Sequence, residues 1–191
     1  MFALDYDGTI ADTNAIKTRW IRDNLDRDVA PYNCDHTWCA PIIGEDNYKR
    51  MSGVVYNREN TRTAEPIPGA PEALKALAAH GPVYIATARD SSNAPFAAEW
   101  LEARGLMEHI ERIVPWVGEP KIAVARSLGC SSLVDDDVRH LTALPADGMK
   151  LLLIKPGFKG TVDLPVDVTL CTNWERIVAE ATAGLSMKPL E

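Results

Sequence analysis

Short apolar runs alternate with segments of helical periodicity along most of the chain. The runs at 2–4, 83–86, 132–134 and 151–154 are uninterrupted, which is typical of strands buried on both faces of a parallel sheet. Helices of about ten residues between such strands indicate β-α-β units. The pattern therefore predicts an α/β fold with a doubly wound parallel sheet. Shorter strands are expected at 113–116 and 166–170, and helices at 15–25, 71–80, 93–104, 120–128, 138–144 and 174–183.

The periodicity weakens between Asp26 and Pro66. This stretch contains scattered prolines and glycines, and only one helix is predicted there, at 46–51 with a possible extension to Arg58. The return to a regular pattern is marked by Pro66, Pro68, Gly69 and Pro71 in close succession. We interpret residues 13–66 as a small, mainly helical cap inserted after the first strand, and residues 1–12 and 67–191 as the core domain.

Charge and cysteine content narrow the class of protein. A net charge of −7 argues against a nucleic acid polymer as the main partner and is compatible with binding a cation. The four scattered cysteines predict free thiols and a cytoplasmic protein. No apolar run approaches the ~20 residues that span a bilayer, so no membrane partner is expected. Cys34, His36 and Cys39 lie close together, but their spacing matches no usual zinc motif.

Polar side chains follow three of the predicted strands at the places where a doubly wound sheet binds ligands, and Lys121 is a fourth polar signal. Asp5 and Asp7 end the first apolar run, and Thr87 ends another. Asp135, with Asp136 and Asp137, ends a third. Because the carboxyl ends of parallel strands meet at one edge, we expect these groups to lie together. Carboxylates in one cleft repel one another, and a bound hard cation such as Mg²⁺ cancels this repulsion. The alternative is that the three consecutive acids only cap the next helix.

Lys121 provides a separate indication. It lies in the first turn of a helix opened by Pro120, where the helix dipole disfavours a cation. A negative group nearby would offset this cost. The alternative is a solvated surface lysine.

These motifs together resemble those of the haloacid dehalogenase-like phosphohydrolase superfamily. The resemblance rests on the run Asp5-Tyr6-Asp7-Gly8-Thr9, on the threonine that ends the Tyr84-Ile85-Ala86-Thr87 run, on Lys121, and on Leu133-Val134-Asp135-Asp136, in that order. It covers the core domain nearly end to end. The last motif is of the paired-acid kind and lacks a spaced second acid, which leaves the roles of Asp136 and Asp137 open.

The resemblance implies a Mg²⁺-dependent phosphatase with defined residue roles. Asp5 would be the nucleophile that forms an aspartyl-phosphate, and Asp7 the general acid and base. Asp5, Asp135 and the backbone carbonyl of Asp7 would hold Mg²⁺. Lys121 would neutralise charge, and Asp136 would orient Lys121 or a metal-bound water. Gly8 and Thr9 would offer backbone N–H groups to the phosphate, and the substrate-binding set is completed by Thr87, Ala88 and Arg89. The acid at position 7 favours a phosphatase over a dehalogenase.

The substrate is expected to be a small phosphorylated metabolite. Thr87-Ala88-Arg89 and the run from Asn173 to Ile177 are similar to features of the deoxyribonucleotidase-like branch, which implies a nucleoside 5'-monophosphate. A phosphosugar or a phosphoglycolate-like acid is the alternative. The locally basic stretch from Lys49 to Arg62 is either a contact for a second anionic group or a solvated face. Arg89 either contacts the phosphate or pairs with Asp90 or Glu99.

Two further questions stay open at this level. The domain could be a phosphate- or metal-binding module without turnover, although none of Asp5, Asp7, Lys121 and Asp135 is missing. The chain is expected to be a monomer or a homodimer. Aromatic side chains of the cap are expected to form mainly its own core, among them Trp20, Trp38, Tyr48 and Tyr56.

Overall fold

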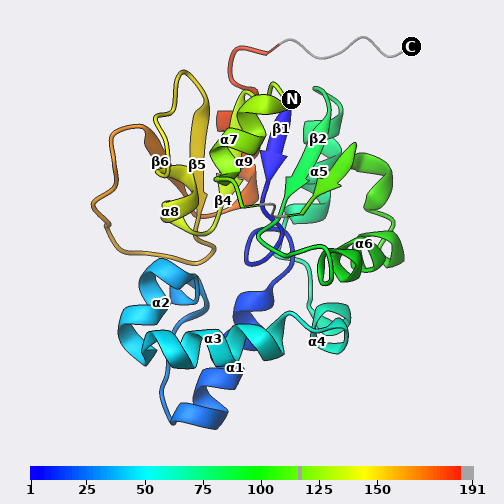
Figure 1. Ribbon diagram of the computed structural model, residues 1–191. Coiled ribbons are helices and arrows are strands. Elements are labelled where there is room, and N and C mark those ends of the chain that lie inside the picture. Colours follow the sequence, from blue (N-terminus) through cyan, green and yellow to red (C-terminus); the bar gives the residue numbers. More distant parts are fainter. Residues whose placement is uncertain (116–117, 186–191) are drawn as a thin grey trace.

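A computed structural model of the protein describes residues 1–115 and 118–185; Trp116, the end of one predicted strand, lies outside them. In the described part of the chain six strands form one sheet in the order β3-β2-β1-β4-β5-β6, and all neighbouring strands are parallel (Figure 1). The predicted doubly wound parallel sheet is confirmed. The strands are β1 (Phe2–Leu4), β2 (Val83–Ala86), β3 (Arg112–Val114), β4 (Ser132–Asp135), β5 (Lys150–Ile154) and β6 (Val168–Cys171).

Alternation along the strands divides the core into two layers. Phe2 and Leu4 point to one face of the sheet and Ala3 to the other. The first face is covered by α5 (Ala70–Ala78), α6 (Ala94–Ala103) and α9 (Trp174–Thr182), and the second by α7 (Lys121–Ser127) and α8 (Val138–Leu141). A short 3-10 turn, η2 (Met107–His109), precedes β3. No helix in the described part of the chain is long and apolar enough to cross a membrane.

The inserted segment folds as a helical layer of its own. It comprises α1 (Thr13–Leu25), η1 (Pro31–Asn33), α2 (His36–Ile43), α3 (Glu45–Val55) and α4 (Arg58–Thr63). Its core, which includes Ile21, Cys39, Met51 and Val55, is separate from the two core layers of the sheet. Figure 1 shows α1, α2 and α3 below the carboxyl ends of the strands, so this layer covers the edge where the polar motifs lie.

The chain leaves and re-enters the core at one place. The Asp12 N–H donates to the Glu65 carbonyl at 2.8 Å, and the Ile67 N–H donates to the Ile10 carbonyl at 2.8 Å. These paired connections lie at the ends of the segment 13–66. We propose this segment as the cap, joined to the core by two adjacent linkers.

The helices of the cap differ most from those predicted. Neither α2 nor α4 was expected, and α3 ends at Val55 without reaching Arg58. Pro41 inside α2 argues against a helix, but buried residues such as Cys39 and Ile43 hold it in place through tertiary packing. In the core domain, α8 ends at Leu141, three residues earlier than predicted.

A buried ion pair connects the cap to the core. Asp35 accepts a hydrogen bond from the Trp38 N–H at 3.2 Å and so caps α2, while its other oxygen lies 2.5 Å from Nζ of Lys155, just after β5. The Lys155 ammonium also lies 4.1 Å from the centroid of the Trp38 ring. Burial raises the pKa of Asp35 to about 6, against the opposing effect of Lys155. The pair is thus a desolvated contact between two parts of the chain about 120 residues apart.

We predict that Lys155→Met lowers the free energy of unfolding by about 3–5 kcal/mol, because it leaves the Asp35 carboxylate buried without its cation. The double variant Asp35→Asn/Lys155→Met should lose less, since asparagine can still cap α2 and no charge is left buried. Urea unfolding of both variants measures the difference.

Lys159→Met, an exposed lysine nearby, is the control and should change the free energy of unfolding by less than about 0.5 kcal/mol. A loss in the double variant as large as in the single variant would mean that the ion pair does not hold the cap.

Candidate active site

Asp5 and Lys121 form the centre of the site. Asp5 directly follows β1, its N–H donates to the Val134 carbonyl on β4 at 2.8 Å, and its carboxylate is buried. Nζ of Lys121 donates to Asp5 Oδ1 at 2.5 Å and to Asp135 Oδ2 at 2.7 Å. One buried ammonium therefore bridges the acids that end β1 and β4. The solvated alternative for Lys121 is wrong, and the negative neighbours expected of it are present.

The charges of this cluster perturb one another. Burial raises the pKa of Asp5 well above its usual range, and neighbouring acids add to the shift against the effect of Lys121. Burial likewise raises the pKa of Asp135 to about 6. For Lys121 burial acts to lower the pKa, but the charges of Asp135 and Asp5 outweigh it and raise the pKa. Strongly perturbed acids in a cleft are typical of functional sites.

Asp136 lies beside this pair and accepts a hydrogen bond from a side chain of the cap. Asn14, in the first turn of α1, donates from Nδ2 to Asp136 Oδ2 at 2.8 Å. A Cβ atom on Gly8 would lie 2.1 Å from that same carboxylate oxygen, and Gly8 has a φ of +78°. Glycine is therefore required at this turn for both space and conformation. Carboxylate oxygens of Asp5, Asp135 and Asp136 all lie within 4.8 Å of one another.

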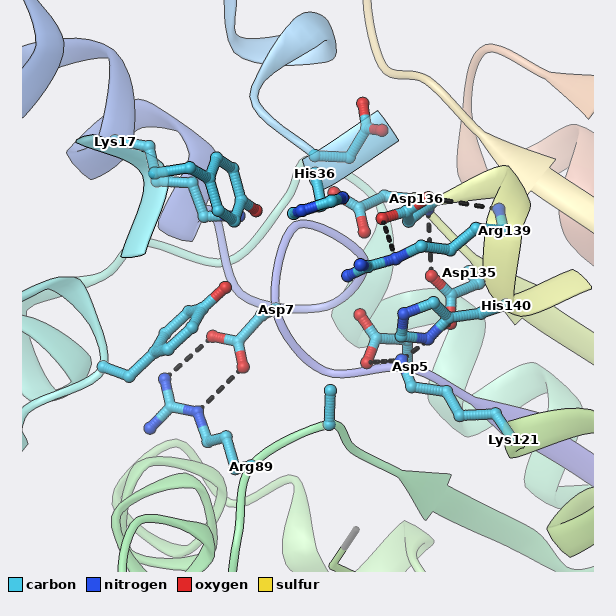
Figure 2. A pocket seen from close by; sticks show the side chains of 15 residues that line it. Asp5, Asp7, Lys17, His36, Arg89, Lys121, Asp135, Asp136, Arg139 and His140 are labelled. Atoms are coloured by element: carbon cyan, nitrogen blue, oxygen red, sulfur yellow. Dashed lines mark hydrogen bonds and ion pairs between the residues drawn. The ribbon is translucent and has the colours of Figure 1, made fainter. Parts of the chain in front are cut away.

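Asp7 is paired with Arg89. Nε and Nη2 of Arg89 donate to the two Asp7 oxygens, each at 2.8 Å (Figure 2). Nη1 of Arg89 donates to Thr61 Oγ1 on α4 at 2.8 Å. This bidentate contact is buried and joins the core motif to the cap. The ion pairs to Asp90 or Glu99 considered for Arg89 are not formed; both of these acids are exposed and accept hydrogen bonds from other groups.

Of the remaining predicted substrate contacts, Ala88 lines this cavity, whereas Gly8, Thr9 and Thr87 lie outside its lining. Oγ1 of Thr87 accepts a hydrogen bond from the backbone N–H two residues later at 3.1 Å. Oγ1 of Thr9 lies 3.4 Å from an oxygen of Asp5 and donates to it. The N–H of Gly8 donates to the Ala11 carbonyl at 2.9 Å. It is therefore engaged within the turn, which differs from the expectation that Gly8 offers this group to phosphate.

Asp137 serves the helix that follows it and the cap. It caps α8 by accepting from the Arg139 N–H at 3.1 Å, and it accepts from Oγ1 of Thr37 on α2 at 2.5 Å. Its charge is paired with Nε of Arg139 at 2.9 Å. His140 lies 3.5 Å from Asp135, and burial with the charge of Lys121 lowers its pKa to about 3, so the ring is neutral. The capping interpretation thus holds for Asp137 among the three acids.

The site is a small, partly open cavity of about 50 Å³, roughly enough for a few water molecules. The cap contributes side chains to its wall that the sequence analysis did not assign to the site: Lys17, His36, Tyr48 and Tyr56. For one of them the sequence contained a signal of burial: Lys17 lies four residues before Ile21 and therefore shares the buried face of α1. Tyr48 and Tyr56 were expected in the cap core and lie at its border with the cavity.

The cavity carries an excess of negative charge. It is lined by six aspartates and by four lysine or arginine side chains. Lys155 pairs with Asp35, so an excess of one negative charge remains, and the clustered donors are carboxylate oxygens, which Mg²⁺ prefers. The residues present therefore fit Mg²⁺, with Asp5, Asp135 and Asp136 as the clustered side chains.

Two other candidate groups do not contribute to the acidic cluster. Lys49, Arg50, Arg58 and Arg62 are exposed and none lines it, so the basic stretch behaves as a solvated face. Cys34 and Cys39 are buried in the cap core, and His36 pairs with Glu45 at 2.9 Å.

Comparison with known proteins gives matches in structure only. No protein-family model and no curated protein sequence matches the chain. A haloacid dehalogenase-like hydrolase from Streptococcus pneumoniae is 16% identical, with a TM-score of 0.62 over 93% of this chain and 96% of that one. A hydrolase of the same family from Deinococcus radiodurans, with bound phosphate and sodium, is 19% identical, with a TM-score of 0.64 over 95% and 94%.

A third match is a haloacid dehalogenase-like hydrolase from Bacillus subtilis bound to magnesium, in which interdomain movement is described. It is 14% identical, with a TM-score of 0.57 over 92% of this chain and 95% of that one. Each match extends over the core and the inserted segment. The sheet order, the inserted helical layer and these matches agree with the resemblance found in the four motifs. The chain therefore has the fold of the haloacid dehalogenase-like hydrolases.

Proposed function

We propose that the protein is a phosphatase that hydrolyses a small phosphomonoester through an aspartyl-phosphate on Asp5. The observation that carries this proposal is the convergence of Asp5, Asp135 and Asp136 within 4.8 Å, with Lys121 bridging two of them. A carboxylate that attacks a phosphate dianion must overcome repulsion between two anions. Buried positive charge beside the nucleophile is the arrangement that reduces this repulsion.

The chain's own residues account for the two chemical steps. An oxygen of Asp5 bonds to phosphorus as the ester oxygen leaves with the proton of Asp7. The Asp7 carboxylate then takes a proton from water, whose oxygen bonds to phosphorus while the bond to Asp5 breaks and phosphate departs. Lys121 lies at the nucleophile throughout, and Thr87 offers a hydroxyl for a phosphate oxygen.

Mg²⁺, when bound by Asp5, Asp135 and the Asp7 carbonyl, would neutralise the phosphate and act as a Lewis acid. Asp136 lies close enough to orient a group in that cluster, although it accepts its hydrogen bond from Asn14 rather than from Lys121. We therefore assign Asp136 a supporting role.

Asp7 must exchange partners during this cycle. Both of its oxygens accept hydrogen bonds from Arg89, and this bidentate contact must loosen for an oxygen of Asp7 to turn to the leaving group. We infer that the Asp7–Arg89 pair opens when substrate enters. Arg89 would then be free to contact the phosphate.

The cavity size bears on the choice of substrate. A space of about 50 Å³ favours a phosphoglycolate-like acid or a small phosphosugar over a nucleoside 5'-monophosphate, which would require displacement of the cap. The nucleotide hypothesis rests on short sequence similarities, and we retain it as the second candidate. We expect the reaction to occur in the cytoplasm, which agrees with the four buried free thiols, and the protein to be a monomer or a homodimer.

We predict that Asp5→Asn lowers kcat for p-nitrophenyl phosphate by at least about 10³-fold, because the amide is a poor nucleophile. Asp7→Asn should behave differently. This leaving group departs as a phenolate without a proton, so the variant should release about one equivalent per protein in a burst and then stall at hydrolysis of the intermediate.

Stopped-flow absorbance measures the burst, and Asp12→Asn, which retains a capping side chain on α1, is the matched control and should turn over normally. If Asp5→Asn retained turnover, another nucleophile or a different chemistry would be required. If Asp7→Asn gave neither a burst nor turnover, Asp7 would be needed before the leaving group departs.

We predict that a chelator abolishes turnover and that Mg²⁺ restores it. Mg²⁺ should also raise the unfolding temperature of the native protein, since a ligand that binds only the folded state stabilises it. Asp135→Asn should lose both effects because it removes a buried ligand of the cluster. Thermal unfolding in Mg²⁺ and in chelator tests this, again with Asp12→Asn as control. An unchanged Mg²⁺ response in Asp135→Asn would place the cation elsewhere.

A binding module without turnover is the alternative from another class. It would show the Mg²⁺-dependent rise in unfolding temperature and no hydrolysis of aryl esters, sugar phosphates or nucleotides. The intact set of Asp5, Asp7, Lys121 and Asp135 favours the enzyme.

A further inference from the structure

Lys17 is a buried cation that the proposed mechanism does not use. It lies on α1 of the cap with a side chain 2% exposed, and it lines the active-site cavity opposite the cluster around Asp5 (Figure 2). Its Nζ donates to Oδ1 of Asn14 at 3.0 Å. The same Asn14 donates to Asp136, so Lys17 is connected to the acidic cluster only through a neutral amide.

Lys17 differs from the other cations of the cavity. Lys121 is bound to Asp5 and Asp135, Arg89 to Asp7, and Arg139 to Asp137. Among the residues that the structure describes, no carboxylate lies within salt-bridge distance of Lys17. Its partner oxygen belongs to a neutral side chain, which leaves an ammonium with three donors only partly satisfied.

The environment nevertheless keeps this side chain charged. Burial acts to lower the pKa of Lys17, but Tyr48 and Tyr56 together with Asp136 and Asp7 outweigh it and raise the pKa well above its usual value. The Nζ lies 6.0 Å and 5.6 Å from the centroids of the Tyr48 and Tyr56 rings, on the wall of the cavity. The wall of the cavity thus presents a charged ammonium, for which an anion of a bound ligand would be the complementary partner.

We propose that Lys17, with Tyr48 and Tyr56, forms a subsite for a second anionic group of the substrate. This rests on the proposed function, because the phosphate to be cleaved lies at Asp5. The substrate class is then a short phosphomonoester that carries a carboxylate or a second phosphate. Lys17 and Asp5 line the same small cavity of about 50 Å³, which favours a ligand whose two anionic groups lie close together. The exposed basic stretch of the cap does not supply this contact.

A competing role must be separated from this one. The lining has an excess of acids, so Lys17 could act only by moderating their summed charge. In that case its removal would weaken every phosphate ligand to a similar extent. A subsite instead affects only ligands that carry the second anion.

The test measures binding without turnover, in excess Mg²⁺, by calorimetry. Phosphonoacetate carries a carboxylate, methylenediphosphonate a second phosphonate, and methylphosphonate neither. We expect the native protein to prefer at least one of the first two over methylphosphonate by about 10-fold or more, and Lys17→Met to remove most or all of that preference. The ligand that shows the preference identifies the anion. Lys49→Met, an exposed cap lysine, is the matched control and should leave the preference unchanged.

Thermal unfolding with and without ligand provides an independent measurement. Because the cavity favours the charged form of Lys17, Lys17→Met should itself unfold at a lower temperature, and it should also lose the additional rise in unfolding temperature that the preferred ligand gives the native protein. Lys17→Gln, which keeps a hydrogen-bond donor for Asn14, serves as the second variant if methionine impairs folding.

Equal losses for all three ligands, or no preference in the native protein, would overturn the subsite. So would a lowered unfolding temperature in both variants with the preference intact, since Lys17 would then be structural. The two proposals fail separately. A Lys17-dependent preference without ester hydrolysis would contradict the phosphatase, and hydrolysis without the preference would contradict the subsite.

Discussion

The convergence of carboxylates at the ends of β1 and β4 is the constraint on which the rest of the site depends. Parallel strands bring Asp5 and Asp135 to one edge of the sheet. These buried carboxylates repel one another, and positive charge must balance this repulsion. Lys121 bridges these two, and Arg89 holds Asp7. The same arrangement that raises the pKa of Asp5 and Asp135 fits a divalent cation and a phosphate. Stability and chemistry therefore involve the same charges.

The cap contributes further polar contacts at the same edge of the sheet. Asn14 reaches Asp136, Thr37 reaches Asp137, and Thr61 reaches Arg89, so three cap helices contact the catalytic edge through polar side chains. These contacts bring polar side chains of the cap to the wall of a small space. The Asp35–Lys155 ion pair is a further buried contact between the cap and the core.

The core could be predicted from sequence and the cap only in outline. The strands follow from uninterrupted apolar runs, and Asp5, Lys121 and Asp135 from their places at the ends of elements, because both signals are local. The helix α2 was missed because Pro41 argues against it locally while tertiary packing permits it. The Arg89–Asp7 contact joins residues 82 apart in sequence, and no local pattern specifies it. Lys17 was missed because a lysine on a helix is ordinarily solvated.

The most direct test of the central claim is the identity of the group that receives the phosphoryl. Asp7→Asn protein mixed with a phosphate ester and Mg²⁺, quenched in acid within the burst and digested, can be analysed by mass spectrometry. The account predicts one phosphoryl group on the peptide that contains Asp5, fragmented to that residue, and none when Asp5→Asn is added. A burst with no phosphorylated peptide, or with the group on another residue, would contradict it.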